Sequence, residues 1–411
     1  MAARRRSAVK RLTARSLIVF CTVAALTSPF VLAGCTREDP PDLTAPISTA
    51  SLEKASPVRF RQLQTSPVSI KLGARNDPNP PSHAVRGIYV SSFAALTPSK
   101  MQSLMKLLDQ TELNAVVLDV NSGARLLSLP RSPRQSSFAR SDSPGARRLR
   151  QAARELKRRR VYLIARVVTF KDFELAAARP EWALKRKDGA VWRDASGHAW
   201  IDPYKEEAWA YPAAVAAEAA ACGFDEVQFD YVRFPENPSR VDREAAYSNP
   251  LGRSKSETIR RFMRYAAGKA RARGVRVSAD VFGMVGSTHG DMGIGQRWQD
   301  LALETDVLSP MVYPSHYSPG TWGIPHPDLS PGPIIARALQ DAAGQNLRLK
   351  RSGKQPSQIR PWIQGFTAGW IHPHQRYGPA QIRDQIRAAR QAGFSSYLIW
   401  NSSCRYPIFR S

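Results

Sequence analysis

The chain contains 411 residues, of which 43% are hydrophobic and 23% charged, which excludes a wholly disordered protein and allows a sizeable buried core. Its formal net charge is +26. The basic residues are scattered along predicted helices such as 147–160 and accompany no recognisable nucleic-acid-binding module, so we expect no nucleic-acid partner.

The first 34 residues are predicted to be an export signal. Residues 1–15 are basic, residues 16–32 are apolar, and the sequence LAGC follows at positions 32–35. LAGC resembles the lipobox of bacterial lipoproteins, in which the cysteine becomes the lipidated first residue of the mature chain. We therefore expect an exported protein, anchored to the membrane of the bacterial cell envelope through Cys35. A plain signal peptide and an uncleaved anchor helix are the alternatives.

Residues 35–83 are rich in proline, serine and threonine and lack apolar periodicity, so they are predicted to form a tether. Residues 84–411 are predicted to form one domain in which strands alternate with amphipathic helices. We expect its strands at residues 86–92, 114–120, 161–170, 225–232, 275–283, 306–314, 360–366 and 395–401. Eight such units predict an α/β fold, a (β/α)8 TIM barrel. The alternative, an open doubly wound sheet, lacks the glycine-rich phosphate turn after its first strand.

Aspartates stand where such a barrel builds its active site, at the C-terminal ends of the strands. Asp230 and Asp280 belong to the fourth and fifth strands, and Asp202 lies in the loop after the third. Glycoside hydrolysis requires two carboxyl groups beside the scissile bond, one as the acid and the other as the nucleophile or base. We predict Asp230 as the nucleophile or base and Asp280 as the acid, with Asp202 as the reserve for the acid.

Other polar and aromatic side chains are expected around the same rim, where they would contact sugar faces and hydroxyl groups. Either Arg166 or Arg233 is expected to keep one catalytic carboxylate ionised. The predicted substrate-binding residues are Tyr89, Asp119, Arg166, Trp200, Tyr231, Arg233, Tyr313, His316, Gln364, Trp400 and Asn401.

Neither a metal ion nor another cofactor is predicted. The histidines include the pair in HPH at 372–374, but the intervening proline is typical of a loop. The sequence contains no G-x-S-x-G motif, which argues against acyl transfer by a serine nucleophile. Cys222 and Cys404 match no metal-binding spacing and are expected at opposite ends of the barrel.

Several motifs carry a family resemblance, among them FDYVRFP (229–235), SADVFG (278–283) and PMVYPSHY (310–317). Over residues 86–406 the chain resembles a bacterial family of glycosyl hydrolase domains of unknown specificity. The resemblance implies a carbohydrate-active (β/α)8 barrel. In related amylase-like barrels the nucleophile ends the fourth strand, which matches Asp230, whereas Val232 stands where chitinase-like barrels place their glutamate acid.

The sequence thus predicts a glycoside hydrolase that acts on a cell-envelope or extracellular polysaccharide by two-carboxylate chemistry. The alternative is a catalytically inactive, carbohydrate-binding or scaffolding lipoprotein.

Overall fold

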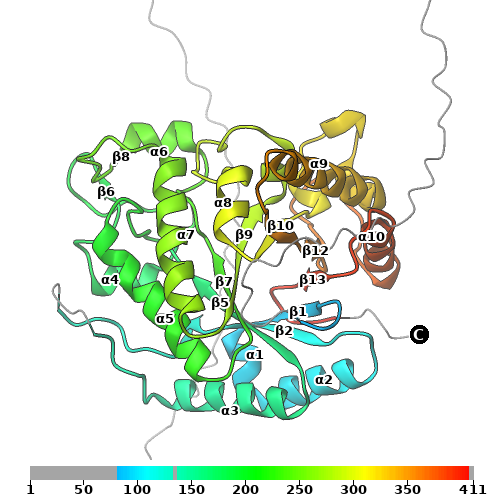
Figure 1. The fold of residues 1–411 in the computed structure, drawn as a ribbon, viewed down its shortest axis with the longest axis horizontal. Coiled ribbons are helices and arrows are strands. Elements are labelled where there is room, and N and C mark those ends of the chain that lie inside the picture. The colour runs from blue at the N-terminus through cyan, green and yellow to red at the C-terminus, as the bar shows by residue number, and fades with distance from the viewer. Residues whose placement is uncertain (1–80, 133–136, 407–411) are drawn as a thin grey trace, which may run out of the picture. The chain divides into compact units, whose positions relative to one another are not determined.

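The computed structural model describes residues 81–132 and 137–406 (Figure 1). The predicted export signal, Cys35 and the tether as far as residue 80 lie outside the described residues. The described chain forms a closed barrel in which all neighbouring strands are parallel, as the sequence predicts. Its strands are β1 (Arg86–Val90), β2 (Ala115–Asp119), β5 (Tyr162–Val168), β7 (Glu226–Asp230), β9 (Arg276–Phe282), β10 (Val307–Met311), β12 (Trp362–Gln364) and β13 (Tyr397–Trp400).

Helices cover the outside of the barrel and return the chain from the end of one strand to the start of the next (Figure 1). The principal helices are α2 (Pro98–Asp109), α3 (Pro144–Arg158), α5 (Ala210–Ala221), α7 (Lys255–Arg271), α8 (Trp298–Glu304), α9 (Pro331–Arg351) and α10 (Pro379–Gln391). One departure from the predicted repeat is that residues 401–406, the described part of the chain after β13, contain no helix.

Several short elements lie in the connections that lead from a strand to the next helix. They are the helices α1 (Ser92–Leu96), α4 (Phe173–Ala178) and α6 (Pro238–Glu244), the hairpin of β3 (Asn121–Ser122) with β4 (Ala124–Arg125), and the pair of β6 (Lys185–Arg186) with β8 (Ala245–Ala246). A further short strand, β11 (Gln358–Ile359), pairs with β10 just before β12 begins.

Sequence signals mark where several of these helices begin and end. The hydroxyl groups of Ser143 and Ser254 accept hydrogen bonds from the backbone N–H groups of Ala146 and Glu257, which caps the first turns of α3 and α7. Basic residues occupy the last turns of α3, α7 and α9, where they complement the helix dipole. Because the barrel strands are parallel, each helix that connects two of them begins near the C-terminal ends of the strands and ends near their N-terminal ends.

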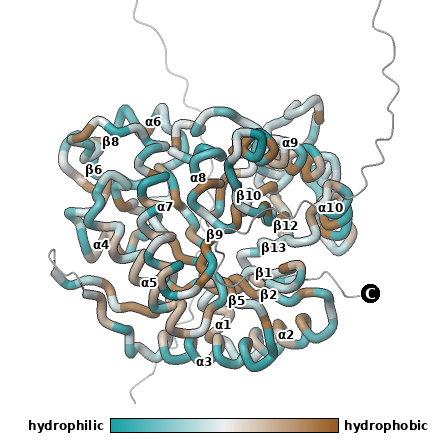
Figure 2. Tube along the Cα trace, in the orientation of Figure 1, coloured by the Kyte–Doolittle hydropathy of each residue, from teal (hydrophilic) through white to brown (hydrophobic). Residues whose placement is uncertain are grey.

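Alternation along the strands separates an outer core from the interior of the barrel. On β5, Leu163 and Ala165 pack in the large outer core, whereas Tyr162 and Ile164 belong to a separate cluster inside the barrel. Figure 2 shows apolar residues along the central strands and mostly polar residues on the outer helices. Since successive side chains point to opposite faces, Arg166 must point inward with Ile164.

The floor of the barrel holds a buried ionic cluster around Glu226 of β7. The Glu226 Oε2 atom accepts hydrogen bonds from Arg360 Nη1 at 3.1 Å and from the Tyr162 hydroxyl at 3.0 Å. Its Oε1 atom accepts one from the Ser278 hydroxyl at 2.5 Å, and Arg276 Nη1 lies 4.0 Å from Oε2. Burial alone would raise the pKa of Glu226, but the charges of Arg360 and Arg276 and the hydrogen bonds from Arg360 and Ser278 together outweigh burial and lower it.

Replacing Glu226 with glutamine is expected to destabilise the barrel by about 3–5 kcal/mol, because two buried guanidinium groups would lose their negative partner. Urea unfolding followed by tryptophan fluorescence measures this loss. The matched control is Glu155→Gln on the exposed surface of α3, which should change the free energy of unfolding by less than about 0.5 kcal/mol. Similar losses in both variants would contradict the assigned role of the cluster.

Candidate active site

A cavity of about 370 Å³ opens among the C-terminal ends of the strands. This volume lies within the usual range of sites for small ligands. Both aspartates predicted to be catalytic, Asp230 and Asp280, line it. The full lining is Arg166, Asp230, Tyr231, Arg233, Glu236, Asp280, Phe282, Gly283, Met284, Met292, Met311, Tyr313, His316, Tyr317, Trp362 and Trp400.

Strand register brings the two aspartates together. Phe229 of β7 pairs with Ala279 of β9, so the next residue on each strand places Asp230 beside Asp280. Neighbouring strands lie about 4.8 Å apart. Val227 and Phe229 pack in the outer core, as do Val277 and Ala279, and the alternation therefore turns both carboxyl groups inward.

Asp230 forms an ion pair with Arg166 of β5. The Asp230 Oδ2 atom accepts hydrogen bonds from Arg166 Nε at 2.9 Å and from Nη2 at 2.6 Å. Its Oδ1 atom accepts a hydrogen bond of 2.6 Å from the backbone N–H of Tyr231, whose φ of 52° lies in the left-handed region that non-glycine residues rarely adopt. The strained backbone and the arginine thus fix the orientation of this carboxylate.

Arg166 is itself positioned by a second layer of groups. Its Nη1 atom donates to Asp119 Oδ1 at 2.6 Å, and the hydroxyl of Tyr89 donates to Asp119 Oδ2 at 2.5 Å. Burial raises the pKa of Asp119, while the charge of Arg166 opposes that rise. Tyr89 and Asp119, which the sequence predicts as substrate contacts, do not line the cavity. Asp119 binds Arg166 directly, and Tyr89 binds Asp119.

Asp280 has a different environment from Asp230. Its side chain is 1% exposed, and Oδ1 accepts a hydrogen bond of 2.8 Å from Trp362 Nε1. Its Oδ2 atom is buried and has no hydrogen-bond partner among the described residues. Burial, and then the negative charge of Asp230, raise the pKa of Asp280 well above its ordinary value. Two adjacent carboxyl groups therefore have different environments, one paired with an arginine and the other buried with an oxygen that lacks a partner among the described residues.

Aromatic rings form much of the cavity wall. Trp400 stacks on Tyr89 with ring centroids 4.0 Å apart, and Trp362 meets Trp400 edge to face at 5.6 Å. The predicted contacts Tyr313 and His316 are also in the wall, where burial lowers the pKa of His316. Such rings can contact the apolar faces of sugars.

Four predicted site residues have structural roles outside the cavity. Trp200 is fully buried and donates to Asp194 Oδ2 at 3.1 Å, so it packs the loop after β5. The carboxylate of Asp202 accepts hydrogen bonds from the backbone N–H groups of Tyr204 and Ser248. Gln364 and Asn401 likewise bond to neighbouring loops. Their polar atoms form hydrogen bonds within the loops at this end of the barrel. Asp202, in particular, does not line the cavity.

Glu236 is a cavity residue that the sequence reasoning missed. Its Oε2 atom pairs with Arg233 Nη1 at 2.7 Å, so Arg233 is not the partner of Asp230. Burial opposes ionisation of Glu236, but the charge of Arg233 and its hydrogen bond, with smaller contributions from the backbone and Lys171, together lower its pKa. Glu236 follows the FDYVRFP motif directly, and its position after the fourth strand could have identified it.

Other features of the described chain bear on the predictions. Among residues 81–132 and 137–406, no group of three or more histidine, cysteine, aspartate or glutamate side chains is arranged to hold a metal ion. Cys222 and Cys404 are both free. No helix in the same residues has the length and apolar character needed to cross a membrane.

Several known proteins are similar to the chain in sequence or in fold. No curated protein matches it. The glycoside hydrolase domain of PgaB (BpsB) from Bordetella bronchiseptica is 14% identical, with a TM-score of 0.52 over 78% of this chain and 95% of that one, and supports the fold. A hypothetical protein from Ruminiclostridium thermocellum is 30% identical over 47% of this chain and 97% of that one, with a TM-score of 0.38.

A chitinase from Chromobacterium violaceum is also similar, with 10% identity and a TM-score of 0.47 over 80% of this chain and 96% of that one. The sequence family described as "Putative glycosyl hydrolase domain" matches residues 87–406, nearly the whole barrel. The chain therefore belongs to this family, and it is a hydrolase that acts on glycosyl bonds.

Proposed function

We propose that the protein hydrolyses a polysaccharide of the cell envelope or its surroundings, with Asp230 as the nucleophile or base and Asp280 as the general acid. One observation carries the proposal: two carboxyl groups on neighbouring strands line the same cavity but have opposite environments. Arg166 stabilises the anion of Asp230, whereas Asp280 is buried with one oxygen unpartnered. Glycoside hydrolysis requires such a pair, with one carboxyl group as the acid and the other as the nucleophile or base.

The neutral carboxyl group of Asp280 can protonate the departing glycosidic oxygen as the bond breaks. The carboxylate of Asp230 can then attack the anomeric carbon or activate a water molecule that does so. Arg166 holds one oxygen of Asp230 and leaves the lone pairs of the other partly free. The aromatic wall supports binding of a sugar chain rather than of a strongly charged small molecule.

The location of the substrate is inferred from residues 1–35. The export signal and the LAGC sequence support transfer across the membrane and attachment through a lipid on Cys35. With two or more acyl chains the attachment would be stable. Polymers of the envelope would then be the nearest glycosidic substrates.

A screen of wall, capsule and secreted polysaccharides tests the function. The purified wild-type protein should release reducing ends from at least one polymer, and the double variant Asp230→Asn/Asp280→Asn should release none. Proton NMR of the first product then gives the anomeric configuration, which separates a nucleophilic from a basic Asp230. Tight polymer binding without release by the wild-type protein would instead support the carbohydrate-binding alternative.

A further inference from the structure

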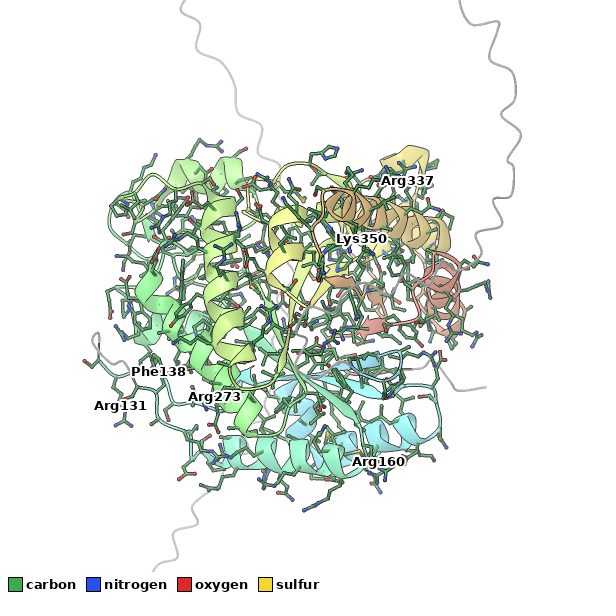
Figure 3. All side chains as sticks on the ribbon, in the orientation of Figure 1. Arg131, Phe138, Arg160, Arg273, Arg337 and Lys350 are labelled. Carbon is green, nitrogen blue, oxygen red and sulfur yellow. The ribbon has the colours of Figure 1, made fainter. Side chains whose placement is uncertain are left out.

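The N-terminal end of the barrel, opposite the cavity, carries exposed basic side chains at the ends of several helices, and this set is here called the basic face. None of them forms an ion pair with another described residue, and Arg160, Arg273 and Lys350 are labelled in Figure 3. The basic face consists of Lys106, Arg158, Arg160, Lys269, Arg273, Arg348, Lys350, Arg351 and Lys354.

Topology brings these residues to one end of the molecule. The helix α3 ends at Arg158 and β5 begins at Tyr162, while α7 ends at Arg271 and β9 begins at Arg276. The helix α9 ends at Arg351, shortly before β11. Because all barrel strands are parallel, the residues that precede them lie at the same end. The cavity lies at the other end, where the strands finish.

Acidic residues at this end do not neutralise the basic face, because they already have other partners. Asp109 pairs with Arg159 at 2.9 Å, and Asp225 pairs with Lys157 at 2.6 Å. Asp306 and Glu112 are paired with Arg271 and Arg390. A helix dipole accounts for one or two basic residues in a last turn, but α9 and its following loop place four within residues 348–354.

The chain also enters the barrel at this end. The backbone N–H of Val85 donates to Ser396 Oγ at 3.0 Å, and that of Tyr397 donates to the Val85 carbonyl at 3.0 Å. These contacts fix the residues just before β1 beside the start of β13. The described chain therefore begins beside the basic face, and the predicted lipid-bearing Cys35 precedes it in the sequence.

We propose that the basic face binds the anionic phospholipid surface of the membrane and directs the cavity away from it. Clusters of four to eight basic residues next to a membrane attachment point are typical of binding to anionic lipids. Leu347 is 48% exposed beside Arg348 and can contact the acyl boundary. A docked barrel would present its cavity to polymers outside the membrane rather than to lipid.

Vesicle co-sedimentation of the full chain carrying Cys35→Ser tests this docking surface without the lipid. Phosphatidylglycerol-containing vesicles are compared with neutral phosphatidylcholine vesicles, so that any contribution of the apolar residues 16–32 is common to both. The charge-reversal variant Arg160→Glu/Arg273→Glu/Lys350→Glu should lower partitioning to the anionic vesicles by more than about a hundredfold, since the loss of each basic residue alone costs about fivefold and each glutamate adds repulsion. Partitioning to neutral vesicles should not change.

The matched control is Lys187→Glu/Arg243→Glu/Arg376→Glu, which changes the net charge equally. These three residues are exposed and belong to loops or short helices that follow strands, at the opposite end. An equal loss in both variants, or binding of wild type that does not weaken with salt, would overturn the proposal. Preferential binding to duplex DNA or to an acidic polysaccharide over anionic vesicles would also overturn it.

The neutral variant Arg160→Gln/Arg273→Gln/Lys350→Gln tests whether any loss of binding comes from a folding defect. It should retain the wild-type circular dichroism and melting temperature and show an intermediate loss of vesicle binding. Catalytic residues line the other end of the barrel, so hydrolysis of a soluble polymer should be unchanged in all of these variants. Docking and catalysis can therefore fail independently in these assays.

Discussion

Asp230→Asn is expected to lower kcat on the polymer substrate by about a thousandfold or more while the barrel remains folded. Asparagine keeps the size of the side chain but can neither attack the anomeric carbon nor accept a proton from water. Arg166 would retain its ion pair with Asp119, so the local structure has support without the second carboxylate. Reducing-end release measures the loss, and circular dichroism checks the fold.

Asp202→Asn provides the matched control for this prediction. Asp202 is as buried as Asp230 but lies outside the cavity, where it accepts backbone hydrogen bonds in the loops after β5 and β7. Its replacement should cost about 1–3 kcal/mol of stability and leave kcat unchanged within about twofold. A large loss of kcat with Asp202→Asn and none with Asp230→Asn would reverse the two assignments.

The barrel could be predicted because its signals are local and repeated. Each predicted strand, including residues 225–232 and 395–401, contains one of the observed barrel strands. The order of strands and helices then left few parallel topologies to choose from. The absence of a helix from residues 401–406, the described part of the chain after β13, departs from the repeat only at its last position.

The partner of Asp230 illustrates what local patterns leave open. Both Arg166 and Arg233 are near it in the expected topology, and the structure selects Arg166. Arg166 shares the inward face of β5 with Ile164, whereas Arg233 follows the left-handed Tyr231 and turns toward Glu236. Side-chain alternation could have favoured Arg166, but the backbone turn after β7 carries no signal in its residue types, because tyrosine rarely adopts that conformation.

Loop residues were the least predictable part of the site. Trp200 and Asp202 belong to a long connection between β5 and β7, and their positions depend on contacts with residues such as Asp194 and Ser248. Residue type alone suggested a sugar-binding tryptophan and a spare carboxyl group. Hydrogen bonds to these two residues show that Trp200 and Asp202 stabilise the loop. A buried polar group whose hydrogen bonds are already made is rarely free to bind a substrate.

Asp280→Asn is expected to remove the proton donor and lower kcat on the polymer by about 10²- to 10⁴-fold. An aryl glycoside with a nitrophenol leaving group needs little protonation, so its cleavage should fall far less. The ratio of the two losses is the diagnostic measurement. If polymer cleavage survives in Asp280→Asn but is lost in Glu236→Gln, the general acid is Glu236 instead.

The pH dependence of the wild-type protein gives an independent check on Asp280. Its pKa is raised from 3.8 in the folded state, so the folded protein binds more protons than the unfolded chain between that value and the raised one. Stability from this residue is therefore lost as the pH rises through that window, and kcat/KM should fall as Asp280 ionises. Asp280→Asn should lack this component of the stability curve, so its free energy of unfolding relative to wild type should increase with pH. An unchanged difference across the window would mean that Asp280 is already ionised and cannot serve as the acid.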